Sequence, residues 1–500
     1  MFNRSLCVRL AAGLALSVVC VANAGTTLRA IYTAIPGDPT SQVPGKAGAE
    51  FGLFERPYRS ESGEKWILRA RTGTFIADEN VIIVGEGGVG DLVVYEGQIA
   101  PWAPTEVIST LDIQCGINAA GQFVFGSNTN NGPDNADEYL ITGQLGSSAL
   151  TVALRQDDEV PGFPGVTHGD LIDDEQILAD GTIAYRTINA VGLPSDEDTL
   201  LVVGDTVIVQ EGITIPAGQL FAFMEPWDAF DFQGFYVSAD GSDVLIDGDV
   251  EGDTVRDEMT VYNGTVVLQE SGVISGFVNP IAGGFTGIRE SYMMSNGDWF
   301  SRGTNSGGGQ DWVVRNSLPV AATGLAIHTG TTEKFADGDT FNTFLAMAGN
   351  NLGDYVIACF TDNADPNRNT VLLLNRVEVI LREGDPVDVD NNGAYDDDAF
   401  LAGFHEDQMF MTDNGSVYFI AFLRDGNGAP LGEAFLRLIP DCVGDTNGDL
   451  IVDVDDLNNI LSNWLVNVGV GSPFDLANND GIVDVDDLNV ALSAWGSNCG

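Results

Sequence analysis

Basic residues are scarce in this sequence. Its 500 residues include 21 Lys and Arg against 73 Asp and Glu, which gives a formal net charge of −52 at pH 7. A surface this acidic repels phosphate groups, so the composition argues against nucleic acid and anionic membranes as partners. The same composition favours cations as partners. Because the acidic residues are spread along the whole chain, the charge is also typical of a soluble, salt-adapted extracellular surface.

Cysteine is rare as well, with six residues in the chain. Cys115 and Cys359 lie inside strand-like apolar runs and are predicted to be buried free thiols. Cys442 and Cys499 lie near the two ends of the C-terminal segment, and in an oxidising compartment they are candidates for a disulfide. The remaining two belong to the N-terminal segment, which is expected to be removed.

Recognisable catalytic motifs are missing from the sequence. It contains no G-x-S-x-G, P-loop or H-E-x-x-H pattern. Three histidines are far apart, lack metal-ligand spacing and are expected in core or surface roles: His168, His328 and His405. Among 73 acidic residues no pair for glycoside hydrolysis can be singled out, because such a pair is defined by its distance in space. The sequence therefore assigns no catalytic residue.

A long apolar stretch occurs only at the start of the chain. Arg4 and Arg9 precede an apolar run from Leu10 to Val21, which is followed by Ala22-Asn23-Ala24. This pattern predicts a secretory signal, residues 1–24, that is cleaved after Ala24. No later stretch reaches the roughly 18 apolar residues that a membrane-spanning helix needs. We therefore expect a secreted protein without a transmembrane segment.

A repeated phrase organises residues 25–440. Its clearest copy is ILADGTIAYR, Ile177 to Arg186, in which a Gly turn separates two strand-like runs. Successive turns lie 56 to 62 residues apart, at Gly63, Gly121, Gly181, Gly241, Gly297, Gly353 and Gly415. A second phrase, an apolar run ending in an acidic or Gly turn such as VIVQEG, keeps the same spacing. Repeats of this length with strand-like content favour a β-propeller.

Each repeat supplies four strand candidates, which is the content of one propeller blade. The last repeat lacks the second phrase, whereas TTLRAIYTAIPGDP near the N-terminus is a copy of that phrase without a repeat of its own. We therefore expect residues 27–36 to pair antiparallel with a strand of the last repeat and close the ring. Counted in this way, the fold class is all-β, a seven-bladed β-propeller.

Two groups of residues in this region leave alternatives open. Trp102 and Trp227 lie in connections after the second phrase and suit either packing of the loop or an aromatic platform for a sugar. The remaining tryptophans of the repeats, Trp66, Trp299 and Trp312, are expected in the core. The acidic segment Asp388 to Asp398 has the oxygen spacing of half a Ca²⁺ loop, but is also typical of a solvated acidic loop.

Residues 441–500 form a second region with a different composition. It contains eleven Asp and no Lys, Arg or Glu. An acidic loop followed by a helix-like run occurs twice, with Asp456 and Asp487, and Trp464 and Trp495, each 31 residues apart. So small a unit with so many like charges needs a divalent cation in order to fold.

This duplication, with its terminal W-G-x-x-C, resembles the dockerin type I domain of bacterial surface proteins. The resemblance implies two Ca²⁺ loops, each followed by a helix. The first loop's ligands are implied at Asp445, Asn447, Asp449, Ile451 (by its carbonyl), Asp453 and Asp456. Those of the second are implied at Asn478, Asp480, Ile482 (by its carbonyl), Asp484 and Asp487. The second loop departs from the family pattern at its start, where Leu476 follows Asp475 and occupies the position of the first ligand.

The same resemblance implies a module that docks a secreted protein onto a cohesin-like or other surface scaffold, often beside polysaccharide-degrading domains. A Ca²⁺-bound C-terminal cap without a partner is the alternative. The propeller repeats are themselves similar to an uncharacterised family of exported bacterial repeat proteins, which implies no activity. We expect a surface-anchored binding or scaffold protein that takes a polysaccharide or protein at the propeller mouth. The alternative is a secreted O-glycosyl hydrolase of polysaccharide breakdown, which convergent carboxylates or stacked aromatic residues at that mouth would favour.

Overall fold

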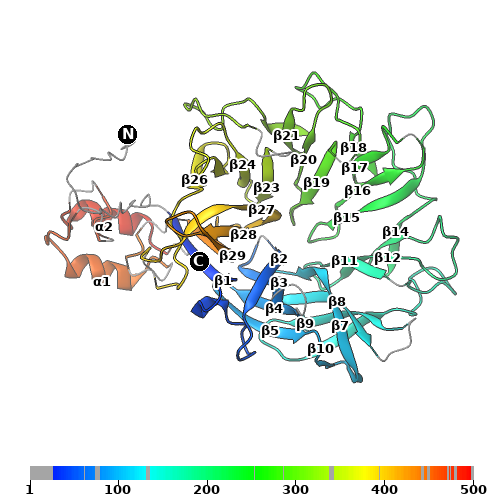
Figure 1. Ribbon diagram of the computed structural model, residues 1–500, viewed down its shortest axis with the longest axis horizontal. Coiled ribbons are helices and arrows are strands. Elements are labelled where there is room, and N and C mark those ends of the chain that lie inside the picture. Colours follow the sequence, from blue (N-terminus) through cyan, green and yellow to red (C-terminus); the bar gives the residue numbers. More distant parts are fainter. Residues whose placement is uncertain are drawn as a thin grey trace.

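Seven antiparallel sheets surround a central axis in the computed structural model of this protein (Figure 1). The structure describes residues 26–60, 62–73, 79–130, 136–169, 171–252, 254–284, 286–336, 343–392, 395–440, 444–446, 451–469, 472, 474–477 and 481–496. Each sheet is one blade. The first strand of a blade lies closest to the axis, except in the second blade, where a strand of two residues precedes the inner strand. The seven-bladed β-propeller predicted from the sequence is therefore confirmed.

The blades follow the chain in order. The first three contain β2 (Phe51–Arg59), β3 (Lys65–Thr72), β4 (Asn80–Glu86) and β5 (Val89–Tyr95); β6 (Ile99–Ala100), β7 (Ala103–Ile117), β8 (Gln122–Asn130), β9 (Glu138–Gln144) and β10 (Leu150–Arg155); and β11 (Leu171–Ile177), β12 (Ile183–Ile188), β13 (Leu200–Val203) and β14 (Thr206–Gln210). The next three contain β15 (Trp227–Val237), β16 (Val244–Val250), β17 (Glu258–Tyr262) and β18 (Thr265–Gln269); β19 (Ile288–Met293), β20 (Trp299–Thr304), β21 (Asp311–Arg315) and β22 (Leu318–Ala322); and β23 (Phe344–Gly349), β24 (Tyr355–Phe360), β25 (Thr370–Leu374) and β26 (Glu378–Arg382). The seventh contains β27 (Phe400–Met411), β28 (Val417–Arg424), β29 (Pro430–Pro440) and β1 (Thr26–Thr33).

The repeated glycine marks the turn between the first and second strands of each blade. Six of the seven turn glycines have φ between +75° and +97°, a region that side chains with a Cβ rarely adopt. In the second blade, for example, the Gly121 N–H donates to the Asn118 carbonyl at 2.8 Å and closes a tight turn. The conformational freedom of glycine therefore explains why this residue recurs at a fixed interval.

Strand β1 closes the ring, as predicted. It pairs antiparallel with β29 from Thr26 opposite Pro440 to Thr33 opposite Ala434. Its other edge is covered by the acidic segment, since the Asp388 N–H donates to the Leu28 carbonyl and the Ala30 N–H to the Asp388 carbonyl. A strand from the start of the chain therefore completes the last blade, and the acidic segment pairs with part of its outer edge.

Aromatic and aliphatic side chains fill the space between neighbouring blades. Trp66 of β3 is fully buried, and its ring meets Phe435 of β29 edge-on at 5.1 Å, so the first blade packs against the seventh. Trp299 and Trp312 are buried as predicted. Cys115 and Cys359 are buried free thiols, also as predicted.

Two short helices follow the propeller, α1 (Val454–Ser462) and α2 (Val485–Ser493). They share a small apolar core in which Ile460, Val483 and Ala491 are fully buried. Both helices lie beside the ring in Figure 1. The described residues contain no helix that is both long and apolar enough to cross a membrane.

Candidate functional site

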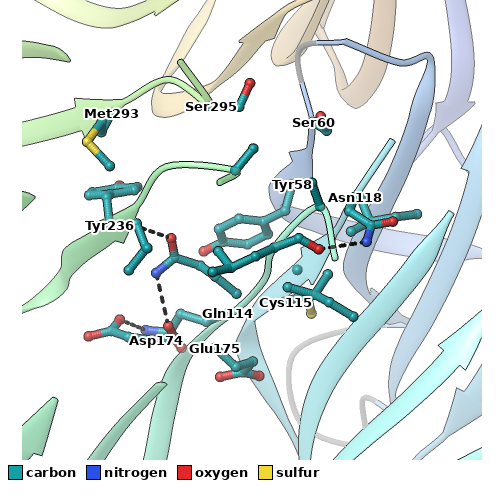
Figure 2. Close-up of a pocket in the computed structure, with 18 of the residues that line it drawn as sticks. Tyr58, Ser60, Gln114, Cys115, Asn118, Asp174, Glu175, Tyr236, Met293 and Ser295 are labelled. Carbon is teal, nitrogen blue, oxygen red and sulfur yellow. Dashed lines mark hydrogen bonds between the residues drawn. The ribbon is translucent and has the colours of Figure 1, made fainter. Parts of the chain in front are cut away.

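A pocket of about 150 Å³ opens at the centre of the propeller (Figure 2). It lies where the first strands of the blades end and turn into the second strands. Residues from six blades line it, carried by β2, β7, β11, β15, β19 and β27 or by the turns that follow them. The lining also includes small uncharged residues: Ser60, Ser62, Asn118, Ala119 and Ala239.

Five aromatic residues line this pocket. Four of them lie five residues before a turn glycine: Tyr58, Tyr236, Tyr292 and Phe410. Neighbouring rings meet edge to face, with centroids 5.9 Å apart for Tyr236 and Tyr292 and 6.0 Å for Tyr292 and Phe410. They form an apolar wall around part of the axis. We expected a ligand at the propeller mouth but did not name these residues, although they share one spacing from the turn glycine.

The Tyr58 hydroxyl is a polar group of this wall that has no partner within the described part of the protein. It is buried, and no described residue forms a hydrogen bond with it. Burial raises the pKa of Tyr58 well above its usual value, so the phenol stays neutral. A neutral buried hydroxyl without a partner can donate to or accept from a ligand atom.

The floor of the pocket is polar, and most of its charged and polar groups bind one another. An ion pair between blades one and five joins Arg56 Nη2 to Glu290 Oε1 at 2.7 Å. Gln114 Nε2 donates to Asp174 Oδ1 at 3.3 Å, and Asp174 also lies 3.3 Å from the Arg186 guanidinium. Glu175 Oε1 accepts the Gly126 N–H at 2.7 Å. The carboxylates of the floor are therefore held by the protein itself.

Buried carboxyl groups also line the contact between blades two and three. Glu138 is 1% exposed, and its Oε1 accepts the Ile172 N–H at 2.8 Å. Its Oε2 is buried and has no hydrogen-bond partner among the described residues. Burial raises the pKa of Glu138 to about 9, although the Ile172 N–H opposes this shift. At neutral pH this side chain therefore keeps its proton.

Replacing Glu138 with Gln is expected to stabilise the protein at high pH. A carboxyl with a raised folded-state pKa stabilises the fold fully below its unfolded pKa, near 4.5, and this contribution is lost as pH rises toward 9. Gln keeps an acceptor for Ile172 without a proton to lose. The free energy of unfolding should exceed that of the wild type by about 1–4 kcal/mol at pH 8 and change little at pH 5. Urea unfolding at both pH values measures this difference, with exposed Glu378→Gln as the control. Equal shifts at both pH values would contradict it.

Of the two alternatives for Trp102 and Trp227, the structure favours packing. Trp227 is 1% exposed, which rules out an aromatic platform at this residue. Trp102 is partly buried and packs against Phe125 and Tyr139, with ring centroids 6.1 Å and 6.3 Å away.

The acidic segment after β26 brings part of its predicted ligand set together. Carboxylate oxygens of Asp388, Asp390 and Asp397 lie within 4.8 Å of one another. The Val389 N–H donates to Asp397 Oδ2 at 2.8 Å, and Leu28 of the closing strand accepts the Asp388 N–H. This arrangement fits both alternatives, the Ca²⁺ loop and the solvated loop, and also shows that the segment holds β1.

The two C-terminal loops are built alike where the structure describes them. In the first, Asp456 is fully buried, its Oδ1 accepts the Thr446 N–H at 2.6 Å and its Oδ2 accepts the Asp453 N–H at 2.8 Å. In the second, Asp487 accepts from Ala477 and Asp484 at 2.8 Å and 2.7 Å. In both loops a hydrogen bond therefore joins the ninth residue (Asp453 or Asp484) to the twelfth (Asp456 or Asp487). These Asp pairs also form capping boxes on α1 and α2.

The remaining predicted ligands divide into two groups. Asp445, Ile451 and Ile482 lie within the described residues. Asn447, Asp449, Asn478 and Asp480 lie outside them, as do Cys442 and Cys499 of the predicted disulfide and residues 1–24 of the predicted signal.

Comparisons with known proteins add similarity in fold only. No family model matches the sequence, and no curated protein matches it. Among solved structures, the β-propeller domain of the Trilobed protease from Pyrococcus furiosus is 9% identical, with a TM-score of 0.37, over 76% of this chain and 92% of that chain. A puromycin-hydrolysing peptidase from Mycobacterium tuberculosis is 12% identical, with a TM-score of 0.35, over 81% of this chain and 56% of that chain. Prolyl oligopeptidase B from Galerina marginata is 9% identical, with a TM-score of 0.32, over 75% and 47%. Such distant similarity assigns no activity.

Proposed function

We propose that this protein is an exported binding protein, attached to a surface scaffold by a Ca²⁺-dependent C-terminal module. The observation that carries the attachment is the matching construction of the two loop–helix units. Each places a buried Asp at the start of a helix, bound to its own loop. A cohesin-like protein is the partner that the sequence resemblance favours for this module.

The donors available in these loops suit Ca²⁺. Asp445, Asp453 and Asp456 supply carboxylate oxygens in the first loop, and Asp484 and Asp487 do so in the second. Carbonyl oxygens of Ile451 and Ile482 would complete the described part of each set. Hard oxygen donors without nitrogen or sulfur favour Ca²⁺ over transition metals. When bound, the ion would neutralise carboxylates that have no Lys or Arg within residues 441–500 to balance them.

The central pocket is the binding site in this proposal. Its aromatic wall and small uncharged lining residues suit an uncharged ligand with an apolar body, and Tyr58 offers one hydrogen bond. A cavity of about 150 Å³ holds a single ring, since apolar cavities of roughly this size bind benzene. The ligand is therefore a small ring compound, or a ring-bearing end group of a polysaccharide or protein.

The aromatic wall is one of the two features that we expected to favour the hydrolase. The state of the two carboxylates that line the pocket favours binding instead. Asp174 is 3% exposed and Glu175 is 1% exposed, and both are bound to neighbouring groups of the chain. Burial, and then the charge of Asp112, raises the pKa of Glu175 well above its usual value. A hydrolase needs two carboxyl groups that reach the scissile bond from either side. A reducing-end assay on a polysaccharide panel is expected to give no product, and any product that disappears in Asp174→Asn would favour the hydrolase.

Phenol is a suitable probe of the pocket. It is expected to bind the wild-type protein weakly, in the millimolar range that so few atoms allow, as measured by saturation-transfer NMR. Tyr58→Phe should weaken binding about threefold to tenfold, because the hydroxyl partner is lost. Ala239→Trp should abolish binding by placing a large ring in the pocket lining. Ser242→Trp, on an exposed turn outside the pocket lining, is the matched control and should bind normally. Equal binding by all four proteins would contradict this assignment.

A further inference from the structure

The two C-terminal loops differ in where their first carboxylate stands. The first loop begins Gly444-Asp445, and the residues 31 positions later are Asp475 and Leu476. The loops are otherwise in the same frame, since the Thr446 N–H and the Ala477 N–H make the same bond to the Asp at the twelfth position. The second loop therefore carries its first carboxylate one residue early.

The side chain of Leu476 lies in the apolar core and not in the position of a ligand. It packs against the apolar core of the module, with Ile460, Val483 and Ala491. Leucine offers no oxygen, and its burial here contributes to the small core that joins the two helices. The position of the expected first ligand is thus used for packing.

Asp475 is turned into the loop instead. It is 9% exposed, and its Oδ2 accepts the Gly481 N–H at 2.8 Å. This contact ties the start of the loop to its sharp Gly turn, where φ of Gly481 is +79°. Oδ1 of the same carboxylate is buried and has no hydrogen-bond partner among the described residues.

A buried carboxylate oxygen without a donor is costly, so it calls for a cation. Residues 441–500 contain no Lys or Arg that could supply one. Asp484 and Asp487, which are joined to each other at the start of α2, belong to the same loop. A hard divalent ion fits this surplus of oxygen donors.

We propose that Asp475 supplies the first ligand of the second Ca²⁺ loop in place of Leu476. This assignment rests on the proposed function, because it requires the module to bind Ca²⁺. It also changes what the sequence implies, since a second loop without a first ligand would bind more weakly than the first. With Asp475 in place, the second loop has a carboxylate at its start, as the first does.

The test follows the second loop alone. Hydrogen–deuterium exchange of the peptide 481–496 is measured in the full mature protein during a Ca²⁺ titration, and the midpoint of protection is recorded. Asp475→Asn keeps an acceptor for the Gly481 N–H and removes the charge, so the midpoint should rise at least about tenfold. Asp455→Asn, an exposed Asp on α1, is the control and should leave the midpoint unchanged.

Each outcome separates the two proposals. If the wild type binds, Asp487→Ala raises the midpoint and Asp475→Asn does not, the assignment of Asp475 is overturned while the module stands. Equal rises in Asp475→Asn and Asp455→Asn would also overturn it, because they would report only the loss of general negative charge. If the wild-type peptide gains no protection at any Ca²⁺ concentration, both proposals fail.

Discussion

Deletion of residues 25–45 is expected to make the protein aggregate. The deletion removes β1 and exposes the backbone edge of β29, which β1 covers from Thr26 to Thr33. It also uncovers apolar surface, because Leu28, Ala30 and Ile31 are buried and the Tyr32 ring packs edge-on against Trp66 at 6.2 Å. An open, apolar strand edge pairs readily with other chains. This is the largest effect that we predict for the propeller.

Size-exclusion chromatography and thermal melting measure this effect. The deletion variant should elute as large species or melt well below the wild type. Gln42→Ala, an exposed position within the same segment, should behave as the wild type. A soluble, monomeric deletion variant with unchanged melting would show that the ring does not depend on this strand.

Removal of Ca²⁺ is expected to unfold the C-terminal module and leave the propeller intact. Among the described residues, the C-terminal module has few fully buried apolar side chains: Val452, Ile460, Val483 and Ala491. These are too few to hold helices of nine residues each against eleven uncompensated Asp. In the function that we propose, Ca²⁺ binding supplies the folding free energy of the module.

Hydrogen–deuterium exchange with and without a chelator distinguishes the two regions of the mature protein. Peptides within 451–469 and 481–496 should lose their protection in the chelator, whereas peptides from β3 and β28 should keep theirs. Asp456→Ala should reproduce the loss in the first loop even with Ca²⁺ present. Unchanged protection of both helices in the chelator would contradict this prediction.

The fold could be predicted because its determinants are local and repeated. Gly121 and Gly181 close the same turn in successive blades, and their spacing is visible in the sequence. The closure by β1 could also be predicted, because the last repeat lacks one strand and the N-terminal segment has one to spare. Regular spacing reports strand order well, since each blade repeats the same local structure.

The candidate site could not be predicted in the same way. Its aromatic wall joins Tyr58, Tyr236, Tyr292 and Phe410 from four blades, and only the ring brings these residues together. In addition, a sequence does not show which of two adjacent side chains turns into a loop and which packs in the core. Leu476 and Asp475 could be told apart only by the packing of one and the hydrogen bond of the other.

Isothermal titration of the Ca²⁺-free protein, residues 25–500, with Ca²⁺ tests the central claim most directly. We predict saturable binding heat in the wild type, and the loss of most of that heat when Asp456→Ala and Asp487→Ala are combined, because these residues provide the twelfth position of both loops. Asp390→Asn, in the acidic segment of the propeller, should retain the module's share of the heat. A wild-type protein that gives no Ca²⁺ heat, or a double variant that gives the same heat as the wild type, would contradict Ca²⁺-dependent attachment.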